Sequence, residues 1–318
     1  PCQGKNPPYG ASLNYHLKSE PKDEVVITIL DAAGKPVRTL KTEPKPEGEE
    51  AGAEDERERD RSVAVPKKAG LNRVWWDLRY DRTEEIRLWT PTVDHAHATV
   101  GPQGWRRFPQ GRFRNGPLAA PGEYTVKLTV GKLESSRKLA VLKDPNTAGT
   151  EADIGEQTRL LVGIHDMTNA SAGIINQVER VRKQLRDLCA LLEGSADAAA
   201  TVKAAQELDQ KLVDLEDFFF PVRLTGSGDG LRWPDKFYAK LGFLASSIGE
   251  ADHPPTAQQR EVYDLFVKQL GDTQNKLDRL IEADLGAINK MLIDSKVPHI
   301  IHKFDRSSPE RPPKEATI

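Results

Sequence analysis

Cysteine is nearly missing from this sequence of 318 residues, which contains only Cys2 and Cys189. Cys189 lies within an amphipathic pattern of leucines, so we expect a small, buried side chain there. Cys2 lies in an N-terminal stretch without regular periodicity. Because the two settings differ so much, we expect no disulfide between them, and the two cysteines say little about the redox compartment of the protein.

A long hydrophobic run is also missing, since no apolar stretch approaches the roughly 20 residues that a helix needs to cross a bilayer. There is no excess of positive charge: 46 lysine and arginine residues stand against 48 aspartate and glutamate residues. We therefore expect neither a nucleic-acid partner nor a membrane span. The chain begins with Pro1 and shows no signal peptide, so we expect either a removed leader or a piece of a longer protein.

The first half of the chain consists of short segments in which apolar and polar residues alternate, separated by glycine and proline. Alternation with this spacing is typical of half-buried β-strands. The predicted strands are residues 11–17, 25–30, 37–40, 70–79, 122–130 and 136–142. They indicate an immunoglobulin-like antiparallel β-sandwich over residues 1–145. It is interrupted by a charged insertion at 41–61, predicted to be mobile, and by a long aromatic loop at 81–120.

Two adjacent tryptophans occupy the predicted strand at 70–79. Val74, Trp76 and Leu78 fall on one face of that strand, and Trp75 falls on the other. We expect the Trp76 face to point into the core. Trp75 is then either an exposed binding platform or a residue covered by the 81–120 loop or by a domain outside this sequence.

The second half changes to a helical period of 3.6 residues. Amphipathic stripes predict four helices, at about residues 150–190, 197–219, 235–248 and 256–294. Thr256 and Gln259 have the spacing of a capping box at the start of the last helix. The pattern predicts an all-α four-helix bundle over residues 150–304, followed by a disordered tail at 305–318.

The 81–120 loop combines aromatic and basic residues, which suits a protein interface and also stacking on sugars or nucleobases. A plainer alternative is an ordered loop packed by its own aromatics. The candidate interface residues, with the outward tryptophan of the strand, are Trp75, Trp89, Trp105, Arg106, Arg107, Phe108 and Phe113.

The most metal-like cluster is Asp94, His95 and His97, because two histidines separated by one residue share a face of an extended chain. No second cluster with ligand spacing follows, and loop histidines are usually just solvated. No carboxylate pair or nucleophile–base arrangement indicates catalysis, so the sequence predicts no cofactor and no active site in this chain.

Four segments in order carry a resemblance to a known module: NPPYGA at 6–11, VVITILDAAGKPVRTL at 25–40, AGLNRVWWDLR at 69–79 and PGEYTVKLTV at 121–130. They resemble the immunoglobulin-like domain of the flagellar hook-capping type. The same order closes a family of large secreted bacterial proteins that carry a sortilin-like, BNR-repeat β-propeller in front. In that family a helical segment follows the sandwich. In the hook-capping module the tryptophan before aspartate is a core residue, and it corresponds here to Trp76.

Members of this family are often labelled glycosyl hydrolase or sialidase because of the propeller repeats, which this sequence lacks. The resemblance implies a secreted, periplasmic or cell-surface location. The favoured hypothesis is a non-catalytic region for assembly, anchoring or binding of a protein partner or of an upstream propeller. The alternatives are an accessory part of a secreted hydrolase whose active site lies in that propeller, and a carbohydrate-binding module using Trp75, Trp89 or Trp105.

Overall fold

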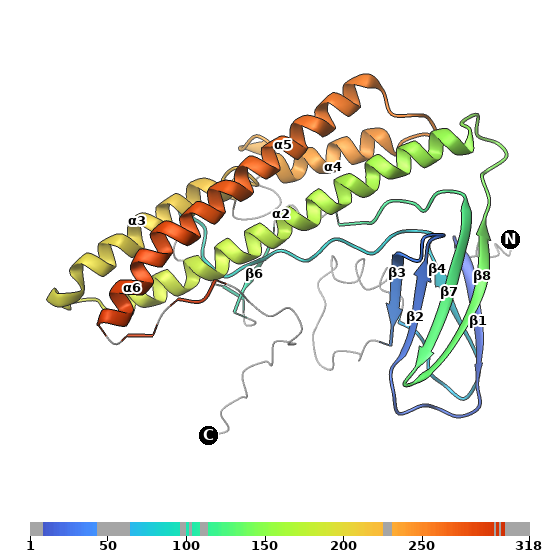
Figure 1. Cartoon of the computed structure of the whole chain (residues 1–318), viewed down its shortest axis with the longest axis horizontal. Helices are drawn as coiled ribbons and strands as arrows, with labels where there is room; N and C mark the ends of the chain where they lie inside the picture. The colour runs from blue at the N-terminus through green and yellow to red at the C-terminus, as the bar shows by residue number, and fades with distance from the viewer. Residues whose placement is uncertain are drawn as a thin grey trace, which may run out of the picture. The chain divides into compact units, whose positions relative to one another are not determined.

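The structure is a computed structural model that describes residues 9–42, 64–95, 100–101, 104–108, 114–224, 231–295, 297–298 and 300–302. It contains antiparallel sheets and helices (Figure 1). The chain divides into two compact units. Unit 1 comprises Pro1–Arg82, Asn115–Val162 and Ala251–Pro254, and unit 2 comprises Thr83–Arg114, Gly163–Glu250 and Pro255–Ile318. The predicted insertion at 41–61 lies almost entirely outside the described residues, as does the tail at 305–318.

Unit 1 contains two antiparallel sheets. A four-stranded sheet has the order β3-β2-β7-β8, and a two-stranded sheet pairs β1 with β4. The strands are β1 (Ala11–Leu17), β2 (Val25–Leu30), β3 (Pro36–Lys41), β4 (Gly70–Trp76), β7 (Gly122–Val130) and β8 (Leu133–Val141). Each strand expected from the alternating pattern is present, within a few residues of its predicted bounds.

Turn chemistry explains the β2–β3 hairpin. Gly34 has a φ of 79°, which a residue without a Cβ adopts without strain. The side chain of Asp31 accepts hydrogen bonds from the backbone N–H groups of Ala33 and Lys35, at 3.0 and 2.8 Å. These bonds hold the turn between the two strands.

The two sheets of unit 1 share one hydrophobic core, to which both contribute alternate residues. Its buried members are Leu13, Val25, Ile27, Ile29, Val37, Leu40, Val65, Val74, Trp76, Ala119 and Tyr124. Trp76 is fully buried, which confirms the predicted orientation of its strand. Leu78 packs at the edge of this core, but β4 ends at Trp76 and Leu78 has a positive φ of 57°.

Helices occupy most of unit 2 and confirm the four predicted helical stretches. They are α2 (Glu151–Leu191), α3 (Ala199–Glu216) after a short 3-10 turn at Ala196–Ala198, α4 (Phe237–Ile248), α5 (Ala257–Arg279) and α6 (Gly286–Asp294). A π-helical segment, Leu280–Leu285, joins α5 to α6 and was not predicted. Thr256 and Gln259 form the predicted capping box. Within the described part of the chain, no helix has the length and apolarity that crossing a membrane requires.

The compact units differ from the predicted division at residues 145–150. Thr83–Arg114, called the inserted segment below, belongs with the helices of unit 2, whereas the sequence pattern assigned it to the β-sandwich. The division also falls within α2, between Val162 and Gly163. Periodicity locates elements along the chain, but the inserted segment is placed by hydrogen bonds to residues more than 80 positions away.

Candidate functional site

The inserted segment is held along α2 by side chains of the helix that bind its backbone. The N–H groups of Glu84 and Arg87 donate to the side-chain oxygens of Asn169 and Asn176, at 2.8 and 2.9 Å. The N–H of Thr90 donates to Glu179 Oε2 at 2.7 Å, and its hydroxyl donates to Oε1 at 2.6 Å. Positions 169, 176 and 179 lie on one face of α2, and their backbone partners are Glu84, Arg87 and Thr90.

Three of the aromatic residues predicted to bind a partner, Trp89, Trp105 and Phe108, contact other side chains of unit 2. Arg180 of α2 lies over the ring of Trp89, at 4.7 Å from its centre, and Arg87 lies over Trp105 at 5.0 Å. Phe108 is buried, and its ring meets those of Phe220 and Tyr238 edge to face, at 4.9 and 5.0 Å. These contacts match the alternative of an ordered, packed loop.

Two other residues of the predicted interface in this segment are Arg107 and Phe113. Arg107 is exposed in the short strand β6 (Arg106–Arg107), which pairs antiparallel with β5 (Arg87–Leu88). Phe113 lies outside the described residues.

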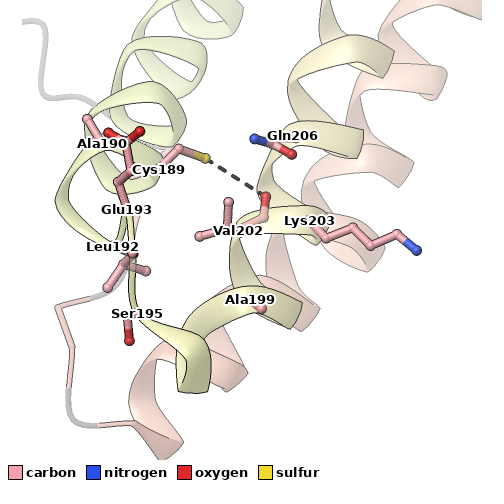
Figure 2. A pocket seen from close by; sticks show the side chains of 10 residues that line it. Cys189, Ala190, Leu192, Glu193, Ser195, Ala199, Val202, Lys203 and Gln206 are labelled. Carbon is pink, nitrogen blue, oxygen red and sulfur yellow. Dashed lines mark hydrogen bonds between the residues drawn. The ribbon is translucent and has the colours of Figure 1, made fainter.

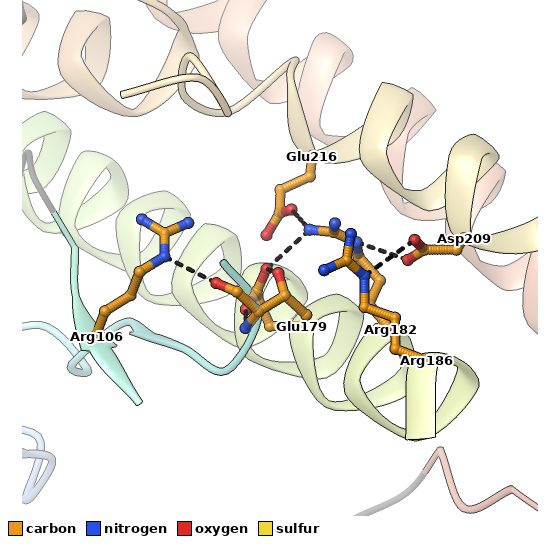
Figure 3. Close-up of polar contacts among 7 residues, drawn as sticks. Arg106, Glu179, Arg182, Arg186, Asp209 and Glu216 are labelled. Carbon is orange, nitrogen blue, oxygen red and sulfur yellow. Dashed lines mark hydrogen bonds and ion pairs between the residues drawn. The ribbon is translucent and has the colours of Figure 1, made fainter. Parts of the chain in front are cut away.

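A buried charge cluster lies where the inserted segment meets α2 and α3 (Figure 3). Arg182 is its centre: Nη1 donates to Glu179 Oε1 at 2.9 Å and to Glu216 Oε2 at 2.6 Å, and Nε donates to Asp209 Oδ1 at 2.9 Å. Arg106 enters from the inserted segment, and its Nε donates to the carbonyl of Thr90 at 2.8 Å. The charge cluster below means Arg106, Glu179, Arg182, Arg186, Asp209 and Glu216.

Burial makes the electrostatics of this cluster strong. Glu179, Arg182 and Glu216 are each at most 2% exposed. Burial, together with the charge of Glu179, raises the pKa of Glu216 well above its usual range, although Arg182 and Arg106 oppose the shift. Burial also lowers the pKa of Arg106. Glu216 Oε1 and Arg182 Nη2 have no hydrogen-bond partner among the residues that the structure describes, which is costly for buried polar atoms.

The raised pKa of Glu216 predicts a pH dependence of stability. The folded chain binds this proton more tightly than the unfolded chain, so the free energy of unfolding should fall as pH rises above about 4.3, the usual glutamate value. Glu216→Gln removes this contribution. In denaturant titrations between pH 4 and 8, the variant should gain stability relative to the parent chain as pH rises. Parallel pH profiles would contradict the prediction.

The charge cluster was not predicted from the sequence, although the sequence contains an indication of it. Glu216 follows Leu208 and Leu212 at spacings of four, so it continues the buried stripe of α3. Arg182 stands likewise between the buried Val178 and Leu185 on α2. A charged residue inside an apolar stripe needs a buried partner, but its identity depends on which elements pack together.

The candidate metal residues do not form a described site. Asp94 pairs with Arg223, with 3.5 Å between Oδ2 and Nε. His95 forms an isolated antiparallel bridge with Thr92, and His97 lies outside the described residues. Among the residues that the structure describes, no three metal-binding side chains come together.

A surface cavity of about 660 Å³ lies where α2 turns into α3 (Figure 2). Cys189 lines it beside Glu193 and Lys203, and its thiol contacts the carbonyl of Val202 at 3.9 Å. Burial raises the pKa of this thiol, which disfavours the reactive thiolate.

The outer face of the β1–β4 sheet presents side chains that the core does not use. Register pairs Ser12 with Trp75, Asn14 with Arg73 and His16 with Leu71, and these six residues define the outer face. Leu71 is 76% exposed and Trp75 is partly exposed. Arg73 Nε donates to Asn14 Oδ1 at 2.8 Å, and no other described residue bonds its guanidinium. Neither strand contains an acidic residue.

Comparison with models of protein families, with curated proteins and with solved structures finds no match to this chain. The chain offers two distinctive polar features among its described residues, the outer face of β1–β4 and the charge cluster. These two features differ in kind, because the outer face is open to solvent while the charge cluster is buried.

Proposed function

We propose that this chain is a region for assembly, anchoring or partner binding within a larger secreted bacterial protein, rather than a catalytic one. In this proposal unit 1 is an immunoglobulin-like sandwich, supported by two antiparallel sheets that share a core. Unit 2 is a four-helix bundle with the inserted segment laid along α2. The motif order that resembles the hook-capping module supports the secreted setting.

The outer face of β1–β4 carries this proposal. Leu71, Arg73 and Trp75 alternate along β4, so their side chains project from one face with a spacing of about 7 Å. Tryptophan and arginine are the residue types most enriched at the energetic centres of protein interfaces. An exposed leucine alone is ordinary, but an apolar residue, an oriented cation and an indole in one line form a surface suited to a partner.

The contacts of the inserted segment also favour the outer face of β1–β4 as the binding surface. Trp89, Trp105 and Phe108 already have partners within unit 2. Trp89 and Trp105 each have an arginine over the ring, whereas among the described residues Trp75 has no such contact. Trp75 is therefore the favoured member of the predicted interface set.

Photo-crosslinking tests this proposal. Trp75→p-benzoylphenylalanine in the full chain, made in its native cells, should yield a discrete protein adduct on irradiation. The matched control is the same replacement of Leu133, which is 76% exposed on β8 of unit 1. Equal adducts at both positions, or none at position 75, would count against the proposal. Binding of a glycan on an array, lost in Trp75→Ala, would favour the carbohydrate-binding alternative.

A further inference from the structure

The chemistry of the outer face specifies the kind of partner, an inference that rests on the proposed function. We propose that the outer face of β1–β4 binds an extended segment of a partner protein in which an acidic residue lies between two apolar residues, in the pattern apolar–x–acidic–x–apolar. The acidic side chain pairs with Arg73, and the apolar side chains contact Leu71 and Trp75.

Charge complementarity supports an acidic partner. Arg73 is the central cation of the face, and neither β1 nor β4 contains an acidic residue that could neutralise it. The bond from Arg73 Nε to Asn14 orients the guanidinium and leaves Nη1 and Nη2 without a partner among the described residues. Two parallel N–H groups on an oriented guanidinium match the geometry of a carboxylate.

Spacing supports an extended segment. Alternate residues of an extended chain lie about 7 Å apart and point the same way, as Leu71, Arg73 and Trp75 do. A segment lying along β4 therefore brings three successive same-side residues over these three positions. The indole of Trp75 offers a large apolar area that loses little conformational entropy on binding.

The other candidate occupants fit less well. A second copy of the chain would bring a face of the same composition, which contains no carboxylate to meet Arg73. A sugar chain could use the hydrogen-bonding side chains of Ser12, Asn14 and His16 on β1, but it would leave the apolar Leu71 without a matching apolar group. A protein segment with apolar side chains satisfies all three positions.

Synthetic peptides test the inference on the full chain. The first probe is a nine-residue fluorescent peptide of threonines with leucine, glutamate and valine at positions three, five and seven; the second has lysine at position five. Measured by fluorescence anisotropy, the glutamate peptide should bind about tenfold more tightly, a difference of ~1.4 kcal/mol. Arg73→Glu should reverse this preference, and Arg73→Met should abolish it. Leu133→Ala should leave it unchanged.

The outcomes separate the inference from the proposed function. Equal binding of both peptides, no binding up to ~1 mM, or an unchanged preference in Arg73→Glu would overturn the inference. If crosslinking from position 75 still captures a protein, the proposed function survives that result. Tighter binding of oligogalacturonate than of the glutamate peptide would replace the protein segment by an acidic sugar. Dimerisation lost in Arg73→Glu would replace it by a second copy. Melting curves establish that the variants are folded.

Discussion

Trp76→Ala should lower the free energy of unfolding of unit 1 by roughly 3–5 kcal/mol, the usual cost of removing a buried large aromatic. The side chain is fully buried in the core between the two sheets. Its ring meets that of Tyr124 edge to face at 5.5 Å, and its Nε1–H donates to the carbonyl of Arg79 at 2.9 Å. Alanine would leave a cavity and an unpaired carbonyl.

Trp75→Ala is the matched control, because it removes the same side chain from the adjacent position of β4. Because the ring of Trp75 is partly exposed, its removal should lower the free energy of unfolding much less than Trp76→Ala does. The main effect of Trp75→Ala should be weaker binding of a partner. Chemical denaturation of both variants measures the difference, which is large against the ~5–15 kcal/mol of a typical domain. If Trp75→Ala proved the more destabilising, the assignment of the two faces of β4 would be wrong.

Arg182→Met should destabilise unit 2 by a similar amount, roughly 3–5 kcal/mol at neutral pH. The arginine binds Glu179, Asp209 and Glu216, and two of these three carboxylates are almost fully buried. Without it, the buried Glu216 loses the cation that most strongly opposes the rise of its pKa, and Glu179 loses its ion-pair partner. The effect exceeds the value of any single ion pair because an uncompensated buried charge remains.

The pH dependence of this loss identifies its cause. Burial raises the pKa of Glu216, so protonation of this one carboxyl should shrink the deficit of Arg182→Met as pH falls through that raised pKa. Lys183→Met is the control: it breaks an exposed ion pair with Asp187 on the same helix and should cost less than ~1 kcal/mol. A deficit independent of pH would indicate lost packing by the arginine stem rather than uncompensated charge.

Local elements of this chain are predictable because their causes are local. The β2–β3 hairpin depends on Asp31 and Gly34, and α5 begins at Thr256 because its capping box is encoded within four residues. The face of Trp76 follows from the alternation of Val74 and Trp76 alone. Such features require no knowledge of which distant segments meet.

The contacts of the inserted segment could not be predicted from the sequence, because they depend on distant residues. Its aromatics predicted packing or binding, but nothing near Trp89 indicates that Arg180, some 90 residues later, lies over its ring. Asn169 and Asn176 read as polar surface positions of α2 until Glu84 and Arg87 are placed beside them. The charge cluster likewise joins Arg106 to α2 and α3, a combination that only tertiary structure specifies.

The bonds between the inserted segment and α2 also constrain the order of events during synthesis. Thr90 leaves the ribosome 89 residues before Glu179, and Glu84 precedes Asn169 by 85. At translation rates of about 5–20 residues per second, these backbone donors wait roughly 4–18 s for their acceptors. Neither hydrophobic docking nor hydrogen bonding to α2 can protect the segment in that interval. The nascent chain therefore presents Trp89 and its neighbours to chaperones and proteases before the helix that covers them exists.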